Sequence, residues 1–495
     1  MSNSRSMELH GQLGHPVIDS DGHFAEIMPV YFDYLKEVGG ARLVQRYQKE
    51  LASSTECMIA NMHSMYRWHR MSPEARRADV APRPPFYGSP ARNTLDRATA
   101  MLPRLMHERL DEMGLDFTVL YPGMGLFAPH HDDEELRRAA CRAFNMYVAD
   151  QFRDYADRMT PAAAIPMHQP GEAIKELEFA VKTLGLKAMM LAGHVVRPIP
   201  SVARKAPVEI SRYAYWVDNL ALDSAYDYDA VWAKCVELKV AATFHSSSYG
   251  WAHRSTGNYQ YNQLGNFAET GHVTCKALFF GGVTRRFPAL RFAFLECGAA
   301  WASALLSDLV GRWGKRNRQA IENYNPVNVD RKMLAELYRQ HADQRALEKL
   351  NEVMRAEERL LENLEDPKTL DEFERCGIKR PEDIVDLFVP RFFFGCEGDD
   401  PTIGCAFNQG LNAFGARLGA LLSSDISHWD VPDMKDVLHE GHELVERGTI
   451  SAEDFRDFAF NNPVKLWAGM NSDFFKGTTV ETAVEKCLRS SGSNC

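Results

Sequence analysis

The sequence contains no run of about 18 apolar residues, which is the length that a membrane-spanning helix needs. Residues 1–14 are polar and lack the apolar centre of a signal peptide. The ten cysteines include no CxxC pair, and several lie in apolar segments, which indicates reduced, buried thiols. These absences predict a cytoplasmic protein without a membrane partner.

Positive charge is also scarce. With 57 Lys and Arg residues against 67 Asp and Glu residues, the net charge is −10, which argues against nucleic acid as the partner. The sequence has no GxSxG, phosphate-loop or dinucleotide-binding motif. What remains, 45% hydrophobic and 25% charged residues, is typical of a globular protein.

Short apolar segments alternate with stretches of helical periodicity along the chain. Eight of these segments are expected to be strands, namely residues 16–21, 117–122, 161–167, 187–192, 240–245, 291–296, 391–395 and 418–425. Eight strands separated by helices predict an α/β fold, a (β/α)8 TIM barrel. Residues 31–92 and 310–387 exceed the minimal barrel, so we expect a single domain with a lid after strand one and a helical appendage after strand six.

The first expected strand leads into Asp19-Ser20-Asp21-Gly22-His23. Side chains alternate along a strand, so Asp19, Asp21 and His23 are expected to point to the same side, into the barrel mouth. A carboxylate and an imidazole in this spacing can bind one divalent metal ion. The same residues also fit a capping aspartate beside a buried histidine, so this motif alone leaves both interpretations open.

Three later strand ends carry similar side chains. Strand five ends at His245, strand six ends at Glu296, and strand eight leads into Asp425 and His428. A carboxylate after an apolar run is costly to bury unless a cation or partner compensates it. Because the C-terminal strand ends of a barrel meet on one face, these residues predict a metal site there.

Taken together, these motifs resemble the amidohydrolase superfamily, nearest to its decarboxylase-like amidohydrolase 2 group. The resemblance covers about residues 15–480 and consists of DxDxH (19–23), His245, ECGxxW (296–301), SDxSHW (424–429) and Asn462-Pro463. It implies that a metal ion is held by Asp21, His23, His245 and Asp425. It also implies that Asp19 orients one of these ligands.

The chain departs from this family pattern at Asp21 and Glu296. Many relatives have an HxH motif in the first strand and a histidine with an acid–base role at strand six. Glu296 is a hard oxygen ligand that can reach a second cation, so both changes favour an oxygen-rich, two-metal site. In length and in residues 245–247 and 271–288, the chain is similar to a branch of TIM-barrel non-haem diiron monooxygenases.

This branch implies a monooxygenase that hydroxylates a hydrophobic acyl substrate such as an acyl-CoA. Two divalent metal ions, preferably iron, with manganese or zinc as alternatives, would use O2 and electrons from an external donor such as a separate reductase. The expected catalytic residues are Glu296 and Asp425. His272 and His428 would complete the ligands of the second ion, and Arg197 and Arg204 would contact the substrate. We also expect a homo-oligomer, namely a dimer.

Two alternatives remain open. The first is a metal-dependent hydrolase or decarboxylase, in which the metal lowers the pKa of a bound water and Asp425 is the general base. The second is a non-catalytic paralogue that keeps the barrel as a subunit of a metalloenzyme complex. The complete set of expected ligands argues against the second alternative.

Overall fold

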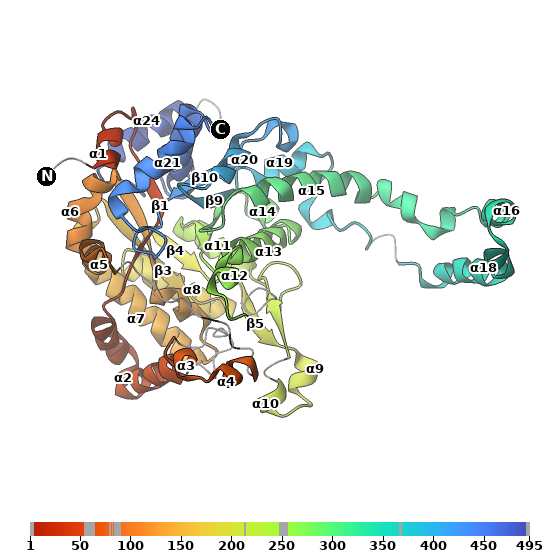
Figure 1. Ribbon diagram of the computed structural model, residues 1–495, viewed down its shortest axis with the longest axis horizontal. Coiled ribbons are helices and arrows are strands. Elements are labelled where there is room, and N and C mark those ends of the chain that lie inside the picture. Colours follow the sequence, from red (N-terminus) through yellow and green to blue (C-terminus); the bar gives the residue numbers. More distant parts are fainter. Residues whose placement is uncertain are drawn as a thin grey trace.

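The computed structural model describes residues 4–53, 65–78, 81, 83, 91–211, 214–246, 256–365 and 369–491. At its centre, eight parallel strands form a barrel in the order β1-β2-β3-β4-β7-β8-β9-β10 (Figure 1). The strands are β1 (Ile18–Phe24), β2 (Phe117–Pro122), β3 (Met159–Ile165), β4 (Ala188–Leu191), β7 (Ala242–Phe244), β8 (Phe292–Phe294), β9 (Phe392–Glu397) and β10 (Gly419–Ser423). The predicted TIM barrel is therefore confirmed.

The barrel closes along a seam between β1 and the residues that follow β10. The backbone N–H of His23 donates to the carbonyl of Ile426 at 3.0 Å, and that of Asp425 donates to the carbonyl of Asp21 at 3.1 Å. Both hydrogen bonds lie at the C-terminal ends of the strands. The seam therefore joins the first and the last of the predicted motifs directly.

Apolar side chains fill the strands below these ends. Phe292 and Phe294 of β8 and Phe392 and Phe394 of β9 are fully buried, and the rings of Phe294 and Phe394 stack with centroids 6.1 Å apart. Each such side chain contributes about 2 kcal/mol by leaving water. This apolar core fixes the strand directions, and the polar motif residues that follow lie at the barrel mouth.

Helices surround the barrel. The helix after β2, α7 (Glu134–Phe152), begins at Asp133, whose side chain accepts a hydrogen bond from the N–H of Leu136 at 2.8 Å. Other helices that cover the barrel are α8 (Pro170–Glu178), α11 (Asp229–Leu238), α13 (Asn266–Phe280), α15 (Ala300–Arg316), α19 (Glu382–Phe388), α21 (Val437–Glu446) and α23 (Asn462–Met470). Of the described helices, none is long and apolar enough to cross a membrane.

Further helices extend this layer or lie in the connections. They are α1 (Arg5–His10), α2 (Met28–Ser53), α3 (Met65–Arg70), α4 (Pro73–Ala78), α5 (Thr94–Met101), α6 (Pro103–Met113), α9 (Pro200–Ala203), α10 (Val208–Ser211), α12 (Tyr259–Gln263), α14 (Val283–Arg286), α20 (Gly404–Phe407), α22 (Ala452–Arg456) and α24 (Glu481–Ser491). The segment expected as a lid, residues 31–92, lies partly outside the described residues. Its longest helix, α2, packs against α7.

An antiparallel hairpin after β4 was not expected from the sequence. It consists of β5 (Val195–Pro198) and β6 (Tyr215–Asp218) and forms a separate two-stranded sheet. Arg197 makes an ion pair with the fully buried Asp218 and donates a hydrogen bond to the hydroxyl of Tyr228 at 2.9 Å. The ion pair joins the two strands of the hairpin, and the hydrogen bond to Tyr228 links the hairpin to the residue before α11.

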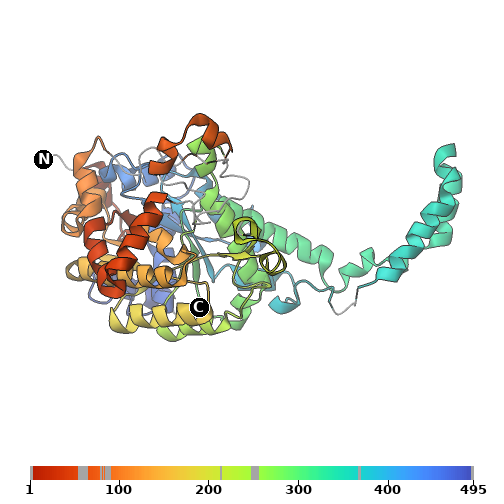
Figure 2. The same cartoon turned by 90° about the horizontal axis from the view of Figure 1, so that it is seen from below.

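A helical arm follows α15 and projects far from the barrel (Figure 1). It carries α16 (Arg331–His341), α17 (Gln344–Glu348) and α18 (Leu350–Arg359) at its end. Figure 2 shows the same projection from a second direction, so the arm stands away from the barrel in both views. It lies within the segment expected as the helical appendage, residues 310–387.

Candidate metal centre

Strand β1 brings Asp21 and His23 to the barrel mouth, but not by the regular alternation that the sequence suggested. Asp19 pairs with Thr118 and Gly22 with Leu120, so β1 holds one extra residue between these pairs. A Cβ atom on Gly22 would lie 2.6 Å from Oδ2 of Asp19 and 2.8 Å from Oγ1 of Thr118. Glycine is therefore needed where the bulge packs its own strand closely.

Asp19 is fully buried and its carboxylate accepts four hydrogen bonds. Oδ1 accepts from the N–H groups of Asp21 (3.2 Å) and Ser424 (2.9 Å), and Oδ2 accepts from the hydroxyls of Thr118 (2.6 Å) and Ser424 (2.7 Å). Asp19 thereby holds the backbone on both sides of the β1–β10 seam. Its expected role in orienting a ligand remains a prediction, and these bonds give it a structural basis.

Asp21, His23 and His245 form one group of side chains that could hold a metal ion. The Nε2 atoms of the two histidines lie 3.2 Å apart, and their rings meet edge to face. Oδ1 of Asp21 is 3.5 Å from Nε2 of His23 and 3.6 Å from Nε2 of His245. Three buried donor atoms therefore surround one point.

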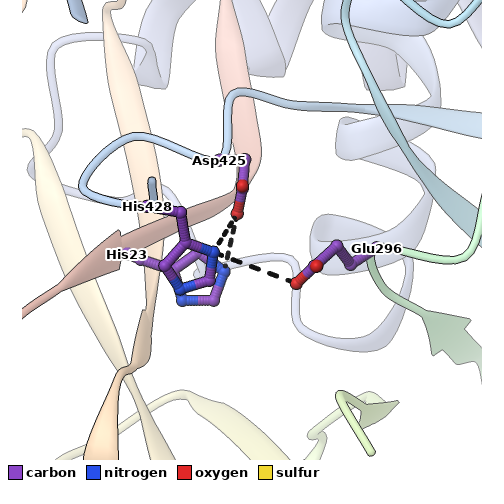
Figure 3. A group of neighbouring side chains, drawn as sticks. All are labelled: His23, Glu296, Asp425 and His428. Carbon is purple, nitrogen blue, oxygen red and sulfur yellow. Dashed lines mark ion pairs between the residues drawn. The ribbon is translucent and has the colours of Figure 1, made fainter. Parts of the chain in front are cut away.

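A second group contains His23, Glu296, Asp425 and His428, and it shares His23 with the first (Figure 3). Oδ1 of Asp425 lies 3.3 Å from Nε2 of His23 and 2.6 Å from Nδ1 of His428. Oε2 of Glu296 is 4.0 Å from Nδ1 of His428 and 3.2 Å from Nε2 of His245. Glu296, a member of the second group, thus also lies close to His245 of the first group.

The backbone is strained where it presents the two carboxylates of the second group. Glu296 has a φ of 54° and Asp425 a φ of 50°, in the left-handed region that side chains other than glycine rarely adopt. Each such conformation costs about 1–3 kcal/mol and is typical of functional sites. The hydroxyl of Ser427, itself at a φ of 82°, donates to the carbonyl of His23 at 2.8 Å and secures this bend.

Burial makes charge unfavourable on every one of these groups. It raises the pKa of Asp21 and of Asp425 well above the usual range, and the negative charge of Glu296 adds to both shifts. Burial also raises the pKa of Glu296 to about 7. It lowers the pKa of His245 to about 3 and that of His23 well below its usual value. A cation bound among these groups would stabilise the charged form of the carboxylates and so offset the free-energy cost of burying their charge.

The carboxylate oxygens of the site are buried without hydrogen bonds. Both Oδ atoms of Asp21, both of Asp425 and Oε2 of Glu296 have no hydrogen-bond partner among the described residues. Buried polar atoms are rarely left in this state. Carboxylate oxygens and imidazole nitrogens are ligands for manganese, iron and zinc, so the residues present fit one or two divalent cations.

His272 does not join these groups, contrary to expectation. It lies on α13 with its ring 5.7 Å from the ring of Trp301, and the charged groups that act on its pKa are Lys276 and Asp308. His272 faces the neighbouring helix α15, which carries Trp301, and not the barrel mouth. The sequence motif did not indicate which way this helical side chain points. Neither group of possible ligands formed by the described residues includes His272.

The two arginines expected at the substrate also lie apart from the donor atoms. Arg197 is paired with Asp218 in the hairpin, where its guanidinium supports the local structure. Arg204 is exposed at the end of α9. Contact of either with a substrate remains a prediction.

Two acidic residues that the sequence analysis did not assign lie beside the site. The pKa of Glu397, at the end of β9, is raised to about 8 by burial and then by Glu296 and Asp430. The negative charge of Asp430 also raises the pKa of Asp425, after burial and the charge of Glu296. Like Glu296, Glu397 follows an apolar strand, and this position could have indicated a place at the site. The Gly and Pro residues after Glu397 favoured a turn instead.

Carboxylates and imidazoles that converge at the C-terminal strand ends are the arrangement found in TIM-barrel proteins that bind a metal ion on this face. Within this class, the chain belongs to the Amidohydrolase family, which matches residues 18–359. The match includes Asp21, His23, His245 and Glu296. Asp425 and His428 follow it in the chain.

Solved structures with a similar chain path include two decarboxylases and an amidohydrolase. A dihydroxybenzoic acid decarboxylase from Polaromonas sp. JS666, with bound manganese and an inhibitor, is 16% identical at a TM-score of 0.49, over 93% of this chain and 99% of that chain. The 2,6-dihydroxybenzoate decarboxylase from Rhizobium is 14% identical at a TM-score of 0.48, over 92% of this chain and 98% of that chain. An amidohydrolase from Mycobacterium avium subsp. paratuberculosis K-10 is 16% identical at a TM-score of 0.49, over 92% of this chain and 100% of that chain. A comparison with curated protein sequences gave no match.

Proposed function

We propose that the protein is a metal-dependent hydrolase or decarboxylase that cleaves a bond to an acyl or carboxyl group of a small organic substrate. The observation that carries this proposal is the set of buried carboxylates without hydrogen bonds, from Asp21, Glu296 and Asp425, beside the imidazoles of His23 and His245. Membership of the Amidohydrolase family supports the same class of reaction.

The chain's own residues would hold the cation and shape its surroundings. Asp21, His23, His245 and Asp425 would be its ligands, and when bound it would lower the pKa of a water molecule and polarise the substrate. The ring of Phe267 packs edge to face on His245 with centroids 5.0 Å apart, and the ring of Tyr121 lies 5.7 Å from His245. These aromatic rings exclude bulk water from the inner side of the site.

Asp425 and His428 are the pair that would move a proton. Oδ1 of Asp425 lies 2.6 Å from Nδ1 of His428, and the side chain of His428 is 21% exposed. In hydrolysis, Asp425 accepts the proton of the attacking water and His428 passes it outward. In decarboxylation, a proton moves the other way and replaces the departing CO2 on carbon.

A second candidate function, oxygenation, is favoured by one observation. Glu296 lies within 3.2 Å of His245 and 4.0 Å of His428, so it could be shared by two cations. A pair of iron ions would permit insertion of one oxygen atom from O2 into a hydrophobic acyl substrate. The second oxygen atom would leave as water, which consumes two protons and two electrons from an external donor.

One experiment separates the two candidates. Protein loaded with manganese or with ferrous iron is analysed for metal per chain and then incubated with carboxylated aromatic compounds and with acyl thioesters, in air and without oxygen. Release of CO2 or free acid that is equal under both conditions, with labelled oxygen arriving only from water, supports the hydrolase or decarboxylase. Product that requires O2 and a reductant and contains oxygen from labelled O2 contradicts it and supports the oxygenase.

A further inference from the structure

The arm that follows α15 exposes an apolar surface that the described part of the barrel leaves uncovered. Eight of the 21 exposed large apolar side chains of the described chain lie between residues 324 and 364. They are 37% to 59% exposed. Met333 and Leu337 lie on α16, and Leu360, Leu361 and Leu364 directly follow α18. Such a concentration on a projecting element marks an interaction surface.

The helices of the arm have little internal core. Ala335 is the one buried residue of α16, and α17 and α18 have none. Isolated helices shorter than about 12–15 residues are marginal in water. Arg331 links α16 to α18, because its guanidinium donates to the carbonyl of Glu357 on α18 at 3.2 Å. It also donates to the carbonyl of Pro326, which precedes α16, at 3.0 Å. The arm therefore needs a further surface to stabilise it.

The charges on the arm are complementary to each other. α16 is basic, with Arg331, Lys332 and Arg339 against Glu336. Residues 350–365 are acidic, with Arg355 and Arg359 against Glu352, Glu357, Glu358, Glu362 and Glu365. In a twofold arrangement, the basic helix of one copy can face the acidic segment of the other, and each contact occurs twice.

We propose that the arm is a self-association element whose apolar face packs against a second copy of this chain, with α16 of each copy facing residues 350–365 of the other. The available area is sufficient. Eight half-exposed apolar side chains offer on the order of 600 Å², and two copies bury about twice this, which reaches the ~1,200–2,000 Å² of a stable interface. The dimer rests on the arm alone and is independent of the reaction at the barrel mouth.

The test compares two pairs of substitutions in the full chain. Leu337→Asp with Leu361→Asp places charge on the arm, and Leu95→Asp with Met101→Asp places the same charge on α5, where Leu95 is 52% and Met101 37% exposed. Mass in solution is measured by light scattering across a wide concentration range. We expect twice 56.0 kDa for the wild type and the α5 pair, and 56.0 kDa for the arm pair with an unchanged circular dichroism spectrum of the barrel.

A wild type that stays at 56.0 kDa at every concentration, or an arm pair as dimeric as the wild type, overturns the proposal. Amide exchange gives a second readout that does not depend on the variants. In the wild-type chain, α16 and α18 should be protected at high concentration and lose that protection on dilution, because the helices are covered only in the dimer. Rapid exchange at all concentrations would also overturn the proposal.

Discussion

Glu296 is the residue whose substitution reports most directly on the reaction. We expect Glu296→Gln to lower kcat by about 10²–10⁴-fold, because an amide cannot exchange a proton or balance a cation as a carboxylate does. The metal held by Asp21, His23 and His245 should remain. Activity and metal per chain are measured on the same preparation.

The metal content of Glu296→Gln also separates the candidate functions. A fall from two metal ions per chain to one identifies Glu296 as a ligand shared by two cations. Unchanged metal with lost turnover identifies an acid–base role at a single cation. A variant with full activity and full metal content removes Glu296 from the site.

His245 and His272 provide a matched test of which histidines bind metal. Nε2 of His245 faces Nε2 of His23 at 3.2 Å, whereas His272 packs on Trp301. His245→Ala should therefore reduce bound metal at least tenfold at limiting metal concentration, while His272→Ala keeps the wild-type amount. Elemental analysis after dialysis gives both values. Equal metal content in the two variants would show that the described geometry does not identify the ligands.

At the scale of single elements, the hairpin β5–β6 depends on one buried charge. Asp218 accepts hydrogen bonds from Arg197, from the N–H of Leu220 and from the hydroxyl of Ser224. Asp218→Ala should reduce the free energy of unfolding by about 3 kcal/mol, because it leaves the guanidinium of Arg197 without its counter-charge. Urea denaturation measures the loss, and amide exchange should rise in residues 195–218.

The control for this hairpin variant is Asp223→Asn. The side chain of Asp223 is 82% exposed, and Asn tolerates its φ of 50° as Asp does, so the change should alter stability by less than about 0.5 kcal/mol. If Asp218→Ala keeps its stability but loses substrate affinity, Arg197 acts on the substrate and not on the hairpin.

Helix α1 is held to the rest of the protein by a bond that depends on pH. Nε2 of His10 lies 2.7 Å from Oδ2 of Asp116, and this hydrogen bond raises the pKa of His10 above 6.5. A raised pKa in the folded state means that the stabilisation is fully present below about pH 6.5 and is lost as the pH rises through the folded value.

His10→Gln should therefore cost at most about 1 kcal/mol at mildly acidic pH and nothing at alkaline pH, since the pair is partly exposed. Urea unfolding of both proteins across this pH range measures the difference. A difference that grows toward alkaline pH would contradict the assignment.

The elements that could be predicted from the sequence are those with long apolar runs. Strand β2 begins at Phe117 and ends at Pro122 as expected, since its six residues are all apolar or β-branched and all buried. The strands β5 and β6 are mostly only half-buried and mix apolar with charged residues, so they lack the buried apolar run that marks the barrel strands. The bulge in β1 has no sequence pattern of its own. Gly22 was the one residue in this segment that could have indicated it.

For the site, the sequence pattern pointed to residues at strand ends, and the structure brings these residues close together. Buried apolar strands precede His245, Glu296 and Asp425. A barrel brings its strand ends together independently of how the surrounding helices pack. His272 lies on a helix, where the direction of a side chain depends on packing that the motif does not encode. Asp430 acts through Asp425 and lies just beyond the motif that pointed to the site.

At the scale of the whole molecule, metal binding should be a major source of stability. Three buried carboxylates lie close together, and their mutual repulsion opposes folding until a cation balances them. Metal at a hundred times its Kd should stabilise the native state by about 2.7 kcal/mol. Tm is measured by calorimetry with metal and with a chelator.

The His245→Ala variant is the control for this effect on Tm. It should show a much smaller rise in Tm with metal than the wild type, because one of the donors is missing. A wild-type Tm that is the same with metal and with chelator would mean that the cluster does not bind the ion under these conditions.

The seam between β1 and β10 has a consequence for how the protein is made. Asp21 and His23 leave the ribosome early, but their backbone partners Ile426 and Asp425 are synthesised only near the end of translation. Until then a nascent chain has an open sheet edge along β1, which is a surface for pairing with other chains, and Asp21 and His23 lack their backbone partners. Premature termination before residue 425 thus yields a polypeptide that has most of the barrel and none of its completed centre.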